Sequence, residues 1–210
     1  LGLIGWTYLI TSVLYLFLFQ RNTYLIAALL FFALLNIADH AGWIKSLLPN
    51  GPHELIPGNG AFQLFAFLGI GATLLLERYK KTGQTAKLPL LYVALGALLI
   101  AAGTLSRQFF IISKIQATPT WVFLCSGIAF IAFALVFWLV DLRGKVHWFD
   151  IIQTAGTATL TCYMIPYLFD IPVKGLIAHG VLGLTKSMLF AFQVIGIANL
   201  LGRLGVKLKI

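Results

Sequence analysis

The residues best suited to chemistry lie between the second and third apolar runs of the chain: Asp39, His40, His53 and Glu54. A histidine beside a carboxylate can act as a general base that its neighbour orients. Because adjacent residues do not face each other on a helix, Asp39 and His40 do not form a dyad by themselves. The alternative is that Asp39 caps a helix while His40 is a solvated interfacial residue. No HExxH or comparable spacing occurs, so no metal site is predicted.

A second candidate is Lys114, which stands between apolar residues in the segment 106–121. An ionisable side chain near membrane depth is energetically costly, and it therefore indicates a functional position by default. The competing explanation is that the lysine extends along the apolar surface and places its ammonium among the lipid headgroups. Both explanations stay open at the level of the sequence.

The densest polar run inside an apolar segment is residues 153–166. Gln153, Thr157 and Thr161 recur at spacings of four and share roughly one helical face, and Tyr163 follows them. Such a face either lines a polar cavity or forms hydrogen bonds to neighbouring helices, each of about 0.6 kcal/mol in a membrane. Pro166 interrupts the same segment, which favours the cavity.

The elements that must position these residues are membrane helices. The chain has 210 residues, 60% hydrophobic and only 10% charged, with a mean hydropathy of +0.95. This composition excludes a water-soluble globule and requires spans of about 20 apolar residues. The net charge is +9, but the basic residues cluster in short loops, so nucleic acid is not an expected partner. Cys125 and Cys162 lie inside apolar runs and predict neither a disulfide nor a CxxC site.

The fold class predicted is all-α, a polytopic transmembrane bundle forming a single multi-pass domain over 1–210. Thr118 and Pro119 have the residue types of an N-cap and a first helical position. Residues 174–184 are apolar but too short to cross alone, so they predict an interfacial or re-entrant helix. About seven spans are expected, near residues 5–19, 24–37, 61–76, 88–105, 121–140, 149–169 and 187–201.

The distribution of basic residues predicts the orientation. Ten Lys and Arg residues follow spans one, three, five and seven, against four in the alternate loops, which places the C-terminus in the cytoplasm. The basic residues of two cytoplasmic loops are also candidates for binding the phosphates of a cofactor. The positive-inside rule explains these residues without any ligand, and it is the favoured explanation. The candidate phosphate ligands are Arg78, Lys80, Lys81, Arg143 and Lys145.

Several stretches resemble the C-terminal half of bacterial multi-pass proteins related to heparan-α-glucosaminide N-acetyltransferase. They are 3–10 (LIGWTYLI), 113–121 (SKIQATPTW), 155–167 (AGTATLTCYMIPY) and the ending 201–210. The resemblance covers nearly the whole chain. It implies a bacterial inner-membrane protein that moves an acetyl group from cytoplasmic acetyl-CoA to an amino sugar or glycan across the membrane.

The family's proposed catalytic histidine lies in a loop of the type Asn-x-Pro-Gly-Ser-Trp, which this chain lacks; His40, in the run DHAGW, is only superficially similar. The chain is therefore expected to be the C-terminal part of a longer protein, or not an acetyltransferase. The alternative function is a non-enzymatic carrier of a small solute, with the Thr face of 153–161 lining its path. Membrane lipids are the expected partners, while a homodimer and a glycan acceptor stay open.

Overall fold

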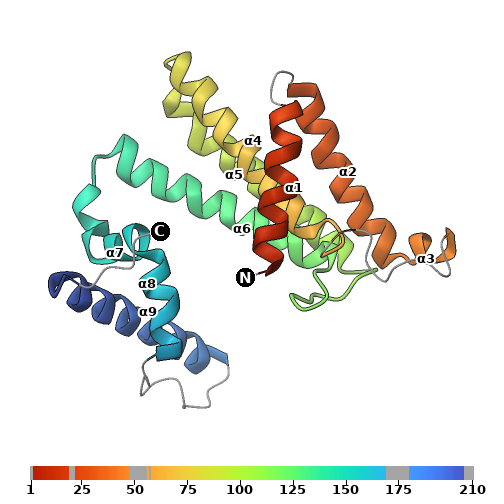
Figure 1. Ribbon diagram of the computed structural model, residues 1–210. Coiled ribbons are helices and arrows are strands. Elements are labelled where there is room, and N and C mark those ends of the chain that lie inside the picture. Colours follow the sequence, from red (N-terminus) through yellow and green to blue (C-terminus); the bar gives the residue numbers. More distant parts are fainter. Residues whose placement is uncertain (1, 19–21, 48–55, 57, 169–179, 206–210) are drawn as a thin grey trace. The chain divides into compact units, whose positions relative to one another are not determined.

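The computed structural model describes residues 2–18, 22–47, 56, 58–168 and 180–205 (Figure 1). Every regular element within these residues is a helix, which confirms the predicted all-α class. The chain forms two compact units, residues 1–143 and residues 144–210. Both units lie within the range that the sequence predicts as a single domain.

The first unit is built from long apolar helices joined by short connections. Thr118 adopts an extended backbone before a helix that begins at Pro119, as the sequence predicts. A turn of π-helix, η2, continues the helix that begins at Pro119, and a 3-10 turn, η1, precedes the helix that begins at Leu88. The elements are α1 (Gly2–Leu18), α2 (Asn22–His40), α3 (Trp43–Leu47), α4 (Ala61–Lys81), η1 (Thr85–Lys87), α5 (Leu88–Ser106), α6 (Pro119–Phe137) and η2 (Trp138–Leu142).

In the second unit, two helix boundaries differ from those expected from the sequence. The predicted span 149–169 is divided into a 3-10 helix η3 (Val146–Ile152), α7 (Gln153–Thr157) and α8 (Thr159–Leu168). The division falls at Ala158, and Pro166 lies inside α8. Residues 174–179 of the predicted interfacial helix lie outside the described residues, while 180–184 form the first turn of α9 (Gly180–Arg203). Ile165 of α8 packs with Val194 and Ala198 of α9.

Five helical stretches in the described part of the chain are long and apolar enough to cross a membrane. They support an integral, multi-pass membrane protein, while the predicted count of about seven spans is not confirmed. Helix α1 is apolar but shorter, at 17 residues. The five stretches are Thr23–His40, Ala61–Lys81, Thr85–Ser106, Pro119–Leu142 and Gly180–Arg203.

Aromatic side chains fill the interior of the first unit. Phe32 of α2 stacks on Phe67 of α4, with ring centroids 5.5 Å apart, and both are almost fully buried. On the other side of α4, Tyr92 of α5 is fully buried and its hydroxyl donates to the carbonyl of Ala72 at 2.6 Å. This bond satisfies a polar group that no water could reach, which fixes α5 against α4.

Two glycines allow α5 and α6 to pack backbone against backbone. A Cβ at Gly96 would lie 2.7 Å from the carbonyl oxygen of Gly127, and a Cβ at Gly127 would lie 2.7 Å from that of Gly96. Small residues permit this approach between membrane helices, where packing replaces the hydrophobic effect as the main attraction. This close contact fixes the two helices against each other, and it thereby fixes the two ends of the loop that joins them.

Candidate functional site

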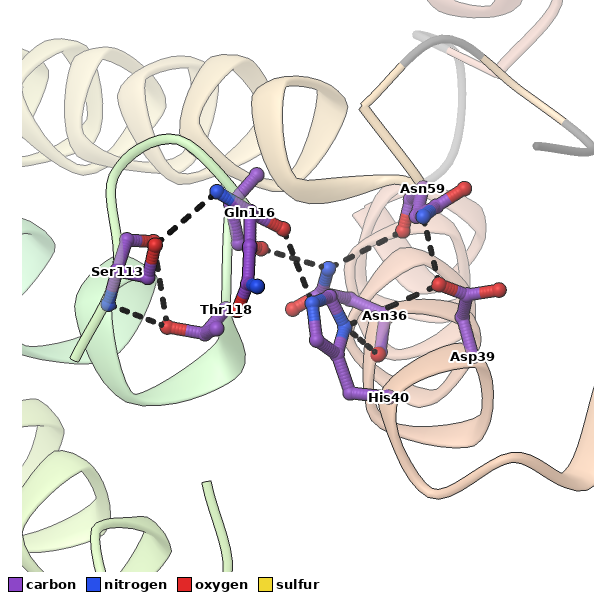
Figure 2. Close-up of polar contacts among 8 residues, drawn as sticks. Asn36, Asp39, His40, Asn59, Ser113, Gln116 and Thr118 are labelled. Atoms are coloured by element: carbon purple, nitrogen blue, oxygen red, sulfur yellow. Dashed lines mark hydrogen bonds and ion pairs between the residues drawn. The ribbon is translucent and has the colours of Figure 1, made fainter. Parts of the chain in front are cut away.

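His40, the last residue of α2, joins two segments that are 76 residues apart in the sequence. Its Nδ1 lies 2.9 Å from the carbonyl oxygen of Asn36, and its Nε2 lies 3.0 Å from the carbonyl oxygen of Gln116. The side chain is only 14% exposed, and the edge of the Phe110 ring approaches it at a centroid distance of 6.3 Å. His40 therefore holds the loop before α6 against the end of α2 (Figure 2).

Asn36 lies one helical turn before His40 and contacts the same region. It is 1% exposed, and its Nδ2 donates to the carbonyls of Asn59, at 3.3 Å, and Ala117, at 3.1 Å. Residues at spacings of three and four lie on one helix face, so Asn36, Asp39 and His40 point the same way from α2. One turn of α2 thus fixes the segment before α4 and the segment before α6.

The carboxylate of Asp39 is held by an amide and lies close to the imidazole. Asn59 donates from Nδ2 to Asp39 Oδ2 at 2.6 Å, and the same oxygen lies 4.0 Å from His40 Nδ1. Asp39 is partly exposed. The Asp39 side chain therefore contacts the polar cluster and keeps some exposure to solvent.

Two non-glycine residues of this cluster have left-handed backbone conformations, Asn59 with φ of 50° and Ala117 with φ of 52°. Asparagine tolerates this region, but an alanine there costs roughly 1–2 kcal/mol. Such strain persists only where the surroundings hold the residue in place. The bond from Asn36 to the Ala117 carbonyl and the bond from His40 to the preceding Gln116 carbonyl supply that restraint.

Internal hydrogen bonds make 113–118 a defined turn. The backbone N–H of Ser113 donates to Thr118 Oγ1 at 3.1 Å, and the N–H of Gln116 donates to Ser113 Oγ at 3.2 Å (Figure 2). Thr118 occupies the N-cap position of α6, but its side chain forms no capping hydrogen bond. Its hydroxyl closes the turn instead.

These segments enclose an open pocket of about 930 Å³. Phe62 of α4 supplies an apolar wall, and the turn 113–118 supplies the wall opposite α2. The pocket combines one carboxylate, one ammonium, two carboxamides and an imidazole, which suits a polar ligand. The pocket is lined in part by Asp39, His40, Asn59, Phe62, Lys114 and Gln116.

The structure brings together three of the predicted site residues, Asp39, His40 and Lys114, at this pocket. Lys114 is exposed and lines the pocket. His53 and Glu54 lie outside the described residues. In the part of the chain that the structure describes, no group of three or more His, Cys, Asp or Glu side chains gathers to hold a metal ion.

The predicted polar face of 153–161 is divided between two helices. Gln153 and Thr157 belong to α7, and the Thr157 hydroxyl donates to the Gln153 carbonyl at 3.2 Å. Thr161 and Tyr163 belong to α8. Thr161 is buried and its Oγ1 has no hydrogen-bond partner among the described residues, whereas the exposed Tyr163 packs against Tyr167 with ring centroids 5.6 Å apart. The break at Ala158 prevents one continuous face.

The candidate phosphate ligands of the first unit lie away from the pocket. Arg78, Lys80 and Lys81 form the last turn of α4, whose first turn borders the pocket; 21 residues of helix separate the two ends by about 30 Å. Arg143 follows η2, and its guanidinium lies 4.7 Å from the centre of the Trp138 ring. Lys145 belongs to the second unit.

Sequence reasoning missed Asn36, Asn59 and Gln116, which complete the site. One signal was present: Asn36 is a polar residue near the end of the apolar run 24–37, at turn spacing before Asp39 and His40. The part played by Gln116 is carried by its backbone carbonyl, which residue types do not reveal.

Comparisons with known proteins assign no family. No protein-family profile matches the chain, and no curated protein and no solved structure matches it.

Proposed function

We propose that the chain is the acceptor-binding portion of a membrane-embedded acyltransferase, and that the pocket beside His40 binds the amino sugar. In this proposal the donor is cytoplasmic acetyl-CoA and the product is an N-acetylated sugar or glycan on the other side of the membrane. The proposal includes a bacterial inner-membrane location, about seven spans and a cytoplasmic C-terminus, as the resemblance and the distribution of basic residues imply.

The observation that carries the proposal is the set of side chains at the pocket. Asp39 offers a carboxylate to the ammonium of an amino sugar, and charge-assisted hydrogen bonds of this kind are the strong ones. The carboxamides of Asn59 and Gln116 offer donors and acceptors for sugar hydroxyls. Phe62 offers an apolar wall for the C–H face of the sugar ring. A neutral sugar would lack the contact with the carboxylate.

The geometry favours Asp39 over His40 as the group that accepts a proton. Both ring nitrogens of His40 already face backbone carbonyls, whereas the Asp39 carboxylate lies at the pocket. Acetyl transfer forms a bond between the amine nitrogen and the acyl carbon and breaks the C–S bond of the thioester. The ammonium loses two protons in all. Asp39 accepts the first, which makes the amine able to attack. The second leaves the nitrogen after attack and passes to the sulfur, so that CoA departs as the thiol.

The basic end of α4 supports a donor site at the opposite end of the first unit. The helix is about 30 Å long, the thickness of the hydrocarbon core. Arg78, Lys80 and Lys81 are exposed there and carry the charge that would attract the phosphates of CoA. Because the amine attacks the thioester directly, the proposal requires the longer protein to bring the thioester end of CoA to the pocket.

The proposal is tested by calorimetric titration of the chain in lipid nanodiscs with glucosamine, N-acetylglucosamine and glucose. We expect glucosamine to bind best, and Asp39→Asn to weaken its binding roughly tenfold or more, because a hydrogen bond to a charged group contributes about 1.5–3 kcal/mol. Asp141→Asn, at an exposed carboxylate on η2, is the matched control and leaves binding unchanged. Equal binding by the wild-type and Asp39→Asn proteins, or no binding of glucosamine, contradicts the proposal.

The alternative, a carrier of a small solute, is favoured by one observation, the buried and unpartnered hydroxyl of Thr161 among the described residues. A polar solute passing along α8 would satisfy that hydroxyl. The carrier hypothesis predicts solute flux into liposomes without any CoA, and it predicts that Thr157→Val with Thr161→Val abolishes the flux. Acetyl transfer without flux, in the intact protein, decides for the acyltransferase.

A further inference from the structure

The two contacts of the His40 ring require more protons than a neutral imidazole has. A neutral ring carries one N–H and one acceptor nitrogen, and the imidazolium carries two N–H groups. Both ring nitrogens of His40 face carbonyl oxygens, at 2.9 and 3.0 Å, and a carbonyl oxygen only accepts. In either neutral tautomer one nitrogen lone pair would point at an oxygen lone pair. Only the protonated ring satisfies both contacts.

We infer that His40 is a positioning residue whose protonated form holds the turn 113–118 against α2, and whose deprotonation releases that wall of the pocket. The inference deepens the proposed function, because it makes binding in the pocket depend on pH, and only this consequence rests on the proposed function. The contact itself rests on the two ring distances alone.

The charges around the ring are few among the described residues that border it. On α2, Asp39 Oδ2 lies 4.0 Å from Nδ1. On the loop, the exposed Lys114 lines the same pocket. Before α4, Asn59 contributes an uncharged amide, and on the loop the ring of Phe110 contributes no charge.

The turn has a reason to move when the contact is lost. Ala117, next to Gln116, holds a left-handed backbone conformation that an alanine does not favour. The His40 contact to the Gln116 carbonyl is one of the restraints on this conformation, together with the Asn36 bond to the Ala117 carbonyl. When the ring loses the proton on Nε2, its contact with the Gln116 carbonyl becomes repulsive, and relaxation at Ala117 then favours the released turn.

The direct test is ¹⁵N NMR of the four histidines together with hydrogen exchange of the turn, in the chain without ligand. Between about pH 5 and 8, where imidazoles change charge, we expect the His40 ring at low pH to show two protonated nitrogens. We also expect the amides of 113–118, corrected for intrinsic exchange, to be protected about tenfold more at the low end of this range than at the high end. A neutral His40 ring throughout the range, or equal protection at both ends, overturns the inference.

Two variants separate positioning from a merely structural contribution. His40→Gln keeps an amide donor group but does not titrate, so the protection of the amides of 113–118 becomes independent of pH. The matched control is His147→Gln, at an exposed histidine paired with Asp150, and it keeps the wild-type dependence of this protection on pH. Ala117→Gly removes the backbone strain, so the turn stays in place at high pH and the pH response shrinks. A pH response unchanged in His40→Gln or in Ala117→Gly contradicts the inference.

Titration with glucosamine at both pH values then connects the turn to binding. Weaker binding at high pH in the wild-type protein, but not in Ala117→Gly, supports control of the pocket by the turn. Because the NMR and exchange experiments contain no sugar, a failure of glucosamine binding contradicts the proposed function and leaves the result on His40 intact. If the protection of the turn depends on pH but the binding of glucosamine does not, control of the pocket by the turn is contradicted.

Discussion

At the scale of residues, the site depends on side chains that bind backbone rather than on side chains that bind one another. Asn36 bonds two carbonyls, and one of them, that of Ala117, lies 81 residues away in the sequence. His40 likewise contacts the carbonyl of Gln116. The composition of the outer loops was sufficient to single out Asp39, His40 and Lys114, because charged and titratable residues are rare in this chain. The composition could not show that both ring nitrogens of His40 contact backbone carbonyls, because residue types do not reveal where a carbonyl lies.

Replacement of Asn36 tests how much the site depends on this one amide. Asn36→Leu has a similar size but leaves two buried carbonyls without their donor, so we expect a loss of about 2 kcal/mol in the free energy of unfolding. Thermal unfolding in one detergent measures the effect. Thr73→Val is the control, because the exposed Thr73 hydroxyl bonds only the Gly69 carbonyl of its own helix. Equal melting temperatures for the two variants would show that Asn36 contributes little.

At the scale of elements, hydropathy located the helices better than it located their ends. The expected span 61–76 continues to Lys81, because basic residues interact favourably with the C-terminal end of a helix and can reach the interface. The expected span 149–169 is broken at Ala158, although hydropathy treats it as one continuous segment. Apolar composition sets whether a segment enters the membrane, whereas a break depends on packing that a single segment does not specify.

The contact between α5 and α6 gives a prediction about elements. Gly96→Ala or Gly127→Ala would place a Cβ 2.7 Å from a backbone oxygen of the opposite helix, so the helices would have to separate. We expect each substitution to lower the free energy of unfolding by about 1–3 kcal/mol. Gly69→Ala is the matched control: nothing lies within 4 Å of its Cβ position, and alanine is the better helix former. Thermal melting that ranks Gly69→Ala below the other two contradicts the packing described.

At the scale of the whole molecule, the five apolar stretches agree with the membrane class expected from composition, and the arrangement of basic residues adds an orientation to test. Thr82 follows α4 on one side of α5, and Phe109 follows α5 on the other. If α5 crosses the membrane, these two exposed positions lie on opposite sides, with Thr82 beside the basic end that the positive-inside rule predicts to be cytoplasmic.

Cysteine labelling in intact cells measures this orientation. In a chain with Cys125→Ala and Cys162→Ala, a maleimide that cannot cross membranes should label the Phe109→Cys variant directly. It should label the Thr82→Cys variant only after the cells are made permeable. The same labelling pattern for both variants contradicts the crossing of α5, and the reverse pattern contradicts the orientation. Neither outcome depends on the proposed activity.

The hairpin of α5 and α6 has a consequence for the biogenesis of the protein. The two helices that approach through Gly96 and Gly127 are neighbours along the chain, and the turn between them supplies a wall of the pocket. All residues that line the pocket come before α6. During synthesis on the ribosome, the pocket can therefore be assembled as soon as this hairpin has entered the membrane. The last third of the chain would then be inserted after all residues that line the pocket are in place.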